Sequence, residues 1–342
     1  MATLRSDMII PEVFVPYVQE QTTQRDAFLA SGVVQPLAAL NATSDGGDFV
    51  NIPFFSANLS GDFEVLTDST SLTPGKITTD KQVGVVLHRG RAFEARDLAA
   101  ISSGADIMGA IGDKLGAYIA NQRQKDLISC LKGVFGSLNA NTSSSAFFNL
   151  CIDSESGDTP TTLSPRHIAQ ARAILGDKGE SLSAICMHSK VFYDLVERRA
   201  IDYVSTEDAR GTTTTQSGGS MGGAYGSPGV PVYMGCRVIV SDDVETAGSG
   251  SSTEYATYVF TPGSVASGEQ AALDIETDRD VLAKSDALAL DAHYLYHPVG
   301  AKWGVTTANP TRSQLETASN WSKVFEDKNI GIIRITNVSN FD

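Results

Sequence analysis

The residues that could do chemistry include a serine in a glycine-rich run. Residues 218–222 match the G-x-S-x-G pattern of a hydrolase nucleophile elbow, with Ser220 as the nucleophile. That elbow needs a strand before the serine and a helix after it, because the sharp turn between them exposes the hydroxyl. Here a run of threonines precedes the motif and more glycines follow it. The context therefore argues against catalysis by Ser220.

The histidines and cysteines lack the spacing of a metal site. His293 and His297 are four residues apart, and on a predicted strand this puts them on one face about 13 Å apart. A single ion with ligands at about 2 Å cannot reach both. The four cysteines are Cys130, Cys151, Cys186 and Cys236. They form no C-x-x-C pair and are expected to be reduced, packed thiols. The sequence therefore predicts no metal, no cofactor and no catalytic residue, and the chain is interpreted as a non-enzyme.

Acidic residues dominate the charge of the chain, which has a formal net charge of −14. Two acidic groups, at 242–243 and 278–280, fall in predicted turns, so solvated turn carboxylates are favoured over cation sites. Proteins that bind duplex DNA use clustered Lys and Arg. The longest basic clusters here are only residues 88–91 and 198–199. A dedicated DNA-binding role is therefore disfavoured.

The composition indicates a folded chain with a sizeable core. The chain has 342 residues, of which 42% are hydrophobic, enough for two medium domains or one elaborated domain. Charged residues make up 19%, which suits a surface that partners cover. No long uncharged apolar stretch and no signal-peptide pattern are present, so neither a membrane span nor secretion is expected.

The first 96 residues are predicted to reach away from the core. Residues 1–48 form an apolar arm interrupted by prolines. Alternating apolar residues predict strands at 49–54 and 82–88, joined by a polar segment at 56–80. A hairpin this long cannot bury both faces inside its own domain. It is therefore expected to project and to pair with another molecule.

A long helix is predicted from about Asp106 to Phe135, because apolar residues recur at spacings of three and four. At 1.5 Å per residue it spans roughly 45 Å. Gly109, Gly112 and Gly116 each weaken it by about 1 kcal/mol. Something must therefore pack closely on the glycine face, and both another part of the chain and another subunit stay open as the partner.

The remaining sequence alternates helices and strands. Helices are predicted after Ser164-Pro165, after Ser189 and after Asn309-Pro310. Strands are predicted at Leu182–Met187, Val230–Val240, Tyr255–Phe260, Ala272–Thr277, Ala287–Tyr296 and Ile330–Val338. Residues 205–229 are poor in apolar side chains and are predicted to be a flexible loop. The pattern is that of an α+β protein.

The order of arm, long hairpin, long helix and mixed α/β region resembles the Hong Kong 97-type major capsid proteins of tailed bacteriophages. The segments that carry the resemblance are Leu59–Gly61, Glu64–Asp68, Leu72–Thr78, Val86–Phe93, Asp97–Ala99, Ala184–Phe192 and His297–Trp303. Together they make the resemblance cover most of the chain, although residues 205–229 carry no recognisable motif.

The resemblance implies a Hong Kong 97-like α+β fold in five segments. These are an N-terminal arm (1–48), an extended loop or E-loop (49–96), a peripheral domain with the spine helix (97–160), a mixed α/β axial domain (161–285) and a return to the peripheral domain (286–342). Contacts between subunits are expected from Phe63, Leu66 and Leu72 in the E-loop.

The resemblance also implies a function. The chain would self-assemble, as hexamers and pentamers, into the icosahedral head shell around a double-stranded DNA genome, which it would contact without sequence specificity. Portal, scaffold or decoration proteins are expected as further partners, and a membrane is not. The protein would be made in the host bacterial cytoplasm and end in the virion capsid. The alternative is an encapsulin, a bacterial nanocompartment shell protein that shares the fold and encloses cargo enzymes.

Overall fold

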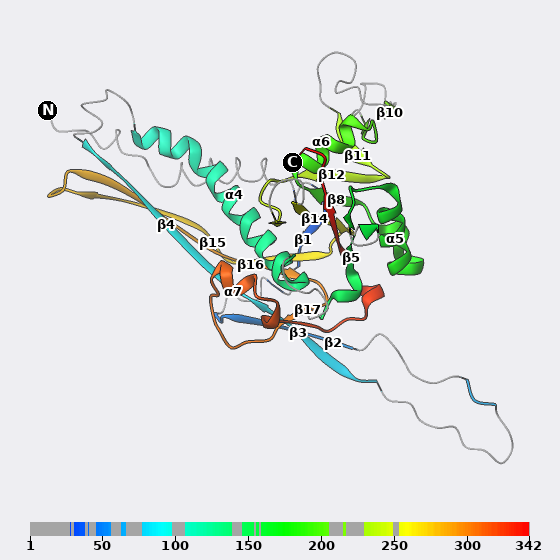
Figure 1. Ribbon diagram of the computed structural model, residues 1–342. Helices are drawn as coiled ribbons and strands as arrows, with labels where there is room; N and C mark the ends of the chain where they lie inside the picture. The colour runs from blue at the N-terminus through cyan, green and yellow to red at the C-terminus, as the bar shows by residue number, and fades with distance from the viewer. Residues whose placement is uncertain are drawn as a thin grey trace, which may run out of the picture.

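The computed structural model describes most of the chain. It covers residues 31–37, 46–55, 77–97, 107–138, 146–153, 159–204, 229–248 and 253–341, with short pieces at 28, 40, 63–65, 155–156 and 215–216. These residues form two main sheets, one long and narrow and the other broad, with a long helix packed beside the narrow one (Figure 1).

The narrow sheet has the strand order β1-β15-β16-β4. Its strands are β1 (Val34–Pro36), β4 (Leu87–Arg96), β15 (Val265–Asp280) and β16 (Ser285–Pro298). β15 and β16 form one antiparallel hairpin, and β4 pairs with β16 along its whole length. The strand predicted at 287–296 covers most of β16, whereas the one predicted at 272–277 covers less than half of β15. The register of β15 shifts twice between Glu269 and Asp274, and these irregularities interrupt the period of two that sequence patterns detect.

The broad sheet has the order β10-β9-β11-β12-β8-β14-β19-β5, with β13 paired to β14. Its strands are β5 (Cys151–Asp153), β8 (Ala184–Met187), β9 (Asp202–Val204), β10 (Thr215–Gln216), β11 (Val230–Tyr233), β12 (Cys236–Val240), β13 (Thr246–Ala247), β14 (Glu254–Phe260) and β19 (Ile332–Val338). β8 and β12 are parallel, as are β5 and β19. Helices α5 (Pro165–Leu175) and α6 (Ser189–Glu197) lie beside this sheet in Figure 1.

Three small antiparallel pairs complete the strands of the described chain. They are β2 (Phe49–Phe55) with β3 (Thr79–Val85), β6 (Glu155–Ser156) with β7 (Thr159–Pro160), and β17 (Ala301–Trp303) with β18 (Trp321–Lys323). Short 3-10 helices lie at Phe148–Leu150, Gly176–Ser181, Ala318–Asn320 and Asp327–Asn329.

The long helix α4 (Ile107–Phe135) confirms the predicted helix. Its apolar positions Leu115, Ile119, Leu127, Leu131 and Val134 are all buried in the main core. Gly112 and Gly116 are also buried in the single chain, so intramolecular packing covers at least part of the glycine face.

Three local predictions are wrong for identifiable reasons. The strand expected at 230–240 is a tight hairpin of β11 and β12, because Met234 and Gly235 both adopt positive φ. His188, rather than Ser189, caps α6, since its Nδ1 accepts from the backbone N–H of Lys190. The helix expected at Asn309-Pro310 is α7 (Arg312–Leu315), capped by Thr311.

The predicted hairpin at 49–54 and 82–88 is present as β2 and β3, with one unexpected feature. The returning strand changes sheets at Val86: β3 pairs with β2, whereas β4 begins at Leu87 and pairs with β16. One continuous stretch of chain therefore fixes the base of the hairpin to the narrow sheet. In Figure 1, β2 and β3 leave the molecule in the direction opposite to the tip of the β15–β16 hairpin.

Candidate assembly surfaces

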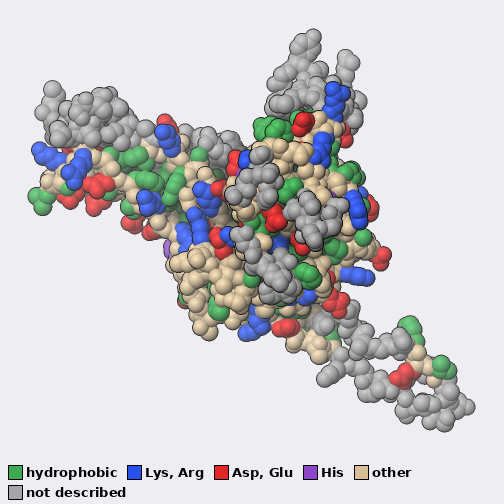
Figure 2. Space-filling model, in the orientation of Figure 1, with side chains coloured by type: hydrophobic (Ala, Val, Ile, Leu, Met, Phe, Trp, Pro, Cys, Tyr) green, Lys and Arg blue, Asp and Glu red, His purple; other side chains and the backbone are tan. Residues whose placement is uncertain are grey.

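The β2–β3 hairpin exposes large apolar side chains. Phe55 is 68% exposed, Phe63 is fully exposed and Val65 is 84% exposed. Leu66 and Leu72, also expected as contacts, lie outside the described residues, as does most of the segment between the strands. Figure 2 shows hydrophobic side chains at this end of the molecule, away from the core. Apolar surface in this position is unfavourable in an isolated chain and becomes favourable when a partner covers it.

The base of the hairpin, in contrast, is packed. Along β3 the exposed residues end at Lys81, and every residue from Gln82 to Val85 is buried. A small apolar cluster beneath the base consists of Leu40, Val50, Val86, Ala266 and Leu295. It joins the arm, both sides of the hairpin and the narrow sheet.

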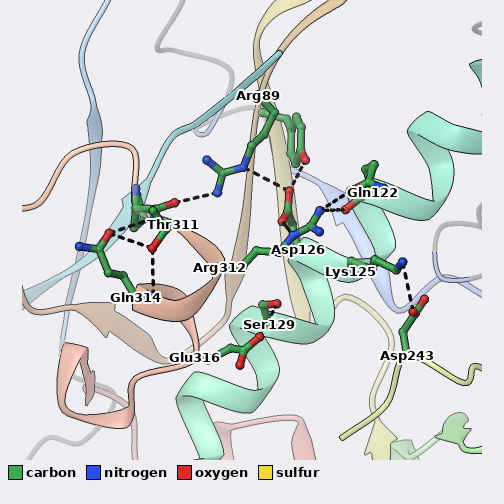
Figure 3. Close-up of polar contacts among 12 residues, drawn as sticks. Arg89, Gln122, Lys125, Asp126, Ser129, Asp243, Thr311, Arg312, Gln314 and Glu316 are labelled. Atoms are coloured by element: carbon green, nitrogen blue, oxygen red, sulfur yellow. Dashed lines mark hydrogen bonds and ion pairs between the residues drawn. The ribbon is translucent and has the colours of Figure 1, made fainter. Parts of the chain in front are cut away.

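A buried ion cluster fixes α4 to the narrow sheet (Figure 3). At its centre is Asp126 of α4, whose side chain is fully buried. Its Oδ2 accepts from the Tyr294 hydroxyl of β16 at 2.5 Å, and its Oδ1 accepts from Arg312 Nε of α7 at 2.5 Å. Arg89 Nε of β4 lies 3.5 Å from Oδ2. A buried carboxylate is tolerated only when it is paired and hydrogen-bonded, as Asp126 is here.

The two arginines of this cluster extend it. Arg312 Nη2 also donates to the Gln122 backbone carbonyl at 3.2 Å and to its side-chain oxygen at 2.7 Å. Arg89 donates to Asn309 Oδ1 at 2.9 Å and to the Pro310 carbonyl at 2.7 Å. Because Asn309 Oδ1 accepts hydrogen bonds from the His88 N–H and from Arg89 of β4, it does not cap a helix. This explains why α7 begins later than predicted. Burial and the neighbouring Asp126 raise the pKa of the Tyr294 phenol.

Sequence reasoning missed this cluster, although a signal for it exists. Ile119, Asp126 and Gly133 follow at intervals of seven and so share one face of α4. A carboxylate on an apolar helix face indicates a buried partner. Gly133 marks a close approach, because an added Cβ would lie 1.8 Å from the Leu315 carbonyl oxygen. The sequence alone does not show that the partners are Arg89 and Arg312, which are distant along the chain.

The tip of the β15–β16 hairpin is held by polar contacts and exposes two aliphatic residues. Asp280 Oδ1 accepts from the N–H groups of Leu282 and Ala283 at 2.8 and 3.0 Å. These bonds lower the pKa of the Asp280 carboxyl. Arg279 pairs with Asp97 at 2.7 Å and with Asp286 at 2.9 Å. Val281 and Leu282 are 76% and 97% exposed. The acidic group at 278–280 therefore supplies contacts within the tip.

The other residues considered for chemistry are scattered. Ser220 lies outside the described residues. Cys130, Cys186 and Cys236 are buried and Cys151 is half-buried, and all four are free. Among the described residues, no group of three or more His, Cys, Asp or Glu side chains could hold a metal ion.

The two acidic residues at 242–243 also serve within the fold. Asp242 Oδ1 accepts from the Ser189 N–H at 3.3 Å, and Asp243 Oδ1 lies 3.7 Å from Lys125 Nζ of α4. Figure 2 shows positive and negative side chains interspersed over this face of the molecule. Within the described part of the chain, no helix has the length and apolarity to cross a membrane.

Solved capsid structures share this arrangement of elements. The capsid chain of cyanophage Pam1 superposes with a TM-score of 0.59 and 14% identity, over 93% of each chain. The capsid chain of Ralstonia phage GP4 gives 0.56 and 11%, over 91% of this chain and 88% of that one. At such identities the likeness shows the fold alone. The fold is the Hong Kong 97-like α+β capsid fold, as the sequence predicted.

The sequence comparisons identify the family. The family model for the Gp13-like proteins, described as major capsid protein 13-like, matches residues 31–331. The major capsid protein of Bacillus phage SPP1 is 34% identical, and the match covers 96% of this chain and 96% of that protein. The chain belongs to the Gp13-like family of phage major capsid proteins, and its role is structural.

Proposed function

We propose that this chain builds the icosahedral head shell of a tailed bacteriophage, as rings of six and five subunits that enclose double-stranded DNA. Family membership over most of the chain carries the proposal. The chain acts by self-association rather than by catalysis, and family membership favours this reading over the encapsulin alternative. Synthesis in the host cytoplasm, a place in the virion, and partnership with portal, scaffold or decoration proteins complete the proposal.

The E-loop is the principal assembly arm in this proposal. In its outer part, the side chains of Phe55, Phe63, Val65 and Ile77 are exposed in the single chain, while its base is packed on the narrow sheet. Phe63 and, outside the described residues, Leu66 and Leu72 contact a neighbouring subunit. Burying three such side chains stabilises an interface by roughly 1.5–3 kcal/mol each before ordering costs. This gain repeats at every subunit of a closed shell.

The five-segment division of the chain remains a prediction. The peripheral domain would combine α4 with the narrow sheet, and the axial domain would contain the broad sheet. The expected boundary at residue 285 falls at the turn between β15 and β16, two strands that are paired with each other.

Electron microscopy of the purified protein after expression in bacteria tests this function. Closed shells with fivefold and sixfold clusters of subunits are expected. Particles from infected cells should contain DNA, whereas an encapsulin would contain a protein cargo. A protein that stays monomeric by sedimentation at every concentration, and forms no shell in infected cells, would contradict the proposal.

A further inference from the structure

His297 of β16 lies buried between the narrow sheet and the base of the β2–β3 hairpin. It is 1% exposed. Its Nε2 lies 3.0 Å from Gln82 Oε1 of β3, and the same oxygen accepts from the Gly300 N–H at 3.0 Å. The other ring nitrogen, Nδ1, is buried and makes no hydrogen bond within the described chain. It faces the β3 backbone, since a Cβ built on Gly84 would lie 3.6 Å from it.

These contacts determine where a proton can be added. Because Gln82 Oε1 accepts from the Gly300 N–H, it acts as an acceptor for His297 too, so Nε2 carries the hydrogen of the neutral ring. A second proton must therefore go to Nδ1, where it would be buried without an acceptor. Burial alone lowers the pKa of His297 to about 4, from an ordinary 6.5.

Within the described part of the chain, the residues around His297 supply no charge that would compensate a proton on its ring. Gln82 and Gly84 of β3, Ala266 of β15 and Leu295 of β16 are its neighbours, and none of them is charged. Lys81, the next residue along β3, is exposed. A protonated His297 can be solvated only if the hairpin base separates from the narrow sheet, since β3 covers the ring.

A second histidine contact lies at the same base. His88 Nδ1 and His293 Nδ1 face each other across β4 and β16 at 2.5 Å, and His88 Nε2 lies 3.6 Å from Asp48 Oδ1. The Asp48 carbonyl accepts from the Val86 N–H at 2.9 Å, just before β2 begins. Asp291 lies on the same face of β16 and pairs with Gly90 of β4. Both histidine contacts therefore lie where the hairpin joins the sheet.

We propose that acid releases the base of the β2–β3 hairpin from the narrow sheet, with His297 as the group whose protonation requires the hairpin to lift. The released state exposes the small apolar cluster beneath the base, while the broad sheet stays folded. This is a property of the chain itself, so it can be tested whether or not the chain forms shells.

The sign and size of the effect follow from proton linkage. In the open state His297 would titrate at its ordinary value, and in the closed state only near pH 4. The equilibrium constant for opening of the hairpin base is therefore independent of pH above about pH 6.5. Below that value it rises roughly tenfold for each unit of pH, until about pH 4. Between pH 7 and pH 5 the increase is on the order of 20-fold.

Hydrogen–deuterium exchange of the full chain, corrected for the intrinsic effect of pH, measures this opening. Protection of residues 49–55 and 79–86 should fall about 20-fold between pH 7 and pH 5, while that of residues 254–260 in β14 holds. His297→Gln places an amide donor opposite Gln82 and cannot gain a proton, so it should abolish the fall. His167→Gln is the matched control. It replaces another histidine of lowered pKa and keeps a capping-box residue at the start of α5, so the fall should remain.

A second variant tests the same proposal if the His297→Gln variant fails to fold. Gln82→Glu supplies a carboxylate that accepts from His297 and stabilises its charged form, so acid release should be suppressed. Equal loss of protection in β2–β3 and β14 would overturn the proposal, because the whole chain would then be unfolding. An unchanged acid response in either the His297→Gln or the Gln82→Glu variant would also overturn it.

Discussion

At the scale of single residues, the buried carboxylate of Asp126 links several elements of the fold. One buried carboxylate connects α4 to β16, β4 and α7 through Tyr294, Arg89 and Arg312. A buried ion pair contributes little net stability when it is compared with an apolar replacement of the same shape. Removing one partner alone is different, because the remaining charges lose their compensation.

Asp126→Asn should therefore lower the free energy of unfolding by about 3 kcal/mol, at the low end of the range for broken buried pairs. The low end applies because Arg312, at 38% side-chain exposure, can still reach water. Urea denaturation measures the change. Asp286→Asn, which removes an exposed partner of Arg279, is the control and should cost at most about 1 kcal/mol. Equal losses in the two variants would show that Asp126 does not have the role assigned to it.

At the scale of elements, the β2–β3 hairpin has a buried base and an exposed outer part. Residues 82–85 are buried at its base, whereas residues 79–81 and the described residues 63–65 are exposed. The outer part adds little to the core of its own chain. Its apolar side chains gain stability only from a partner, which suits an assembly arm.

Replacing residues 59–78 with a short Gly-Ser turn should separate folding from assembly. The shortened chain should stay soluble and unfold at a near-normal temperature, because β2, β3 and the packed base are retained. Shell formation, seen by electron microscopy, should be lost or severely reduced. Normal shells from the shortened chain would refute the assembly role, and failure to fold would place the segment in the core.

At the scale of the whole molecule, the charge distribution sets the relation to DNA. The net charge is −14, and the visible face mixes both signs instead of presenting a basic stripe (Figure 2). DNA affinity depends on neutralising phosphates with clustered cations, so this chain offers little of it.

The free subunit should therefore bind duplex DNA weakly, and salt should remove what binding there is. A gel-shift assay across a salt series measures this directly. A tight complex that resists salt would contradict the prediction.

Patterns that depend on neighbours along the chain were visible in the sequence. The apolar spacing of α4, the Ser164-Pro165 start of α5 and the alternation of β2 each encode one element through local periodicity or capping. The order of those elements carried the family resemblance, and the resemblance implied the fold. Neither kind of signal identifies which distant side chains meet.

Tertiary structure decided the features that depend on distant contacts. Arg89 and Arg312 are more than 200 residues apart, and they meet Asp126 only because β4 and α7 pack against the same helix. Likewise, Asn309 serves β4 instead of capping a helix. The imidazole of His297 is buried only because the hairpin base covers it. Burial and charge compensation are properties of the packed chain, and no local pattern of residues determines them.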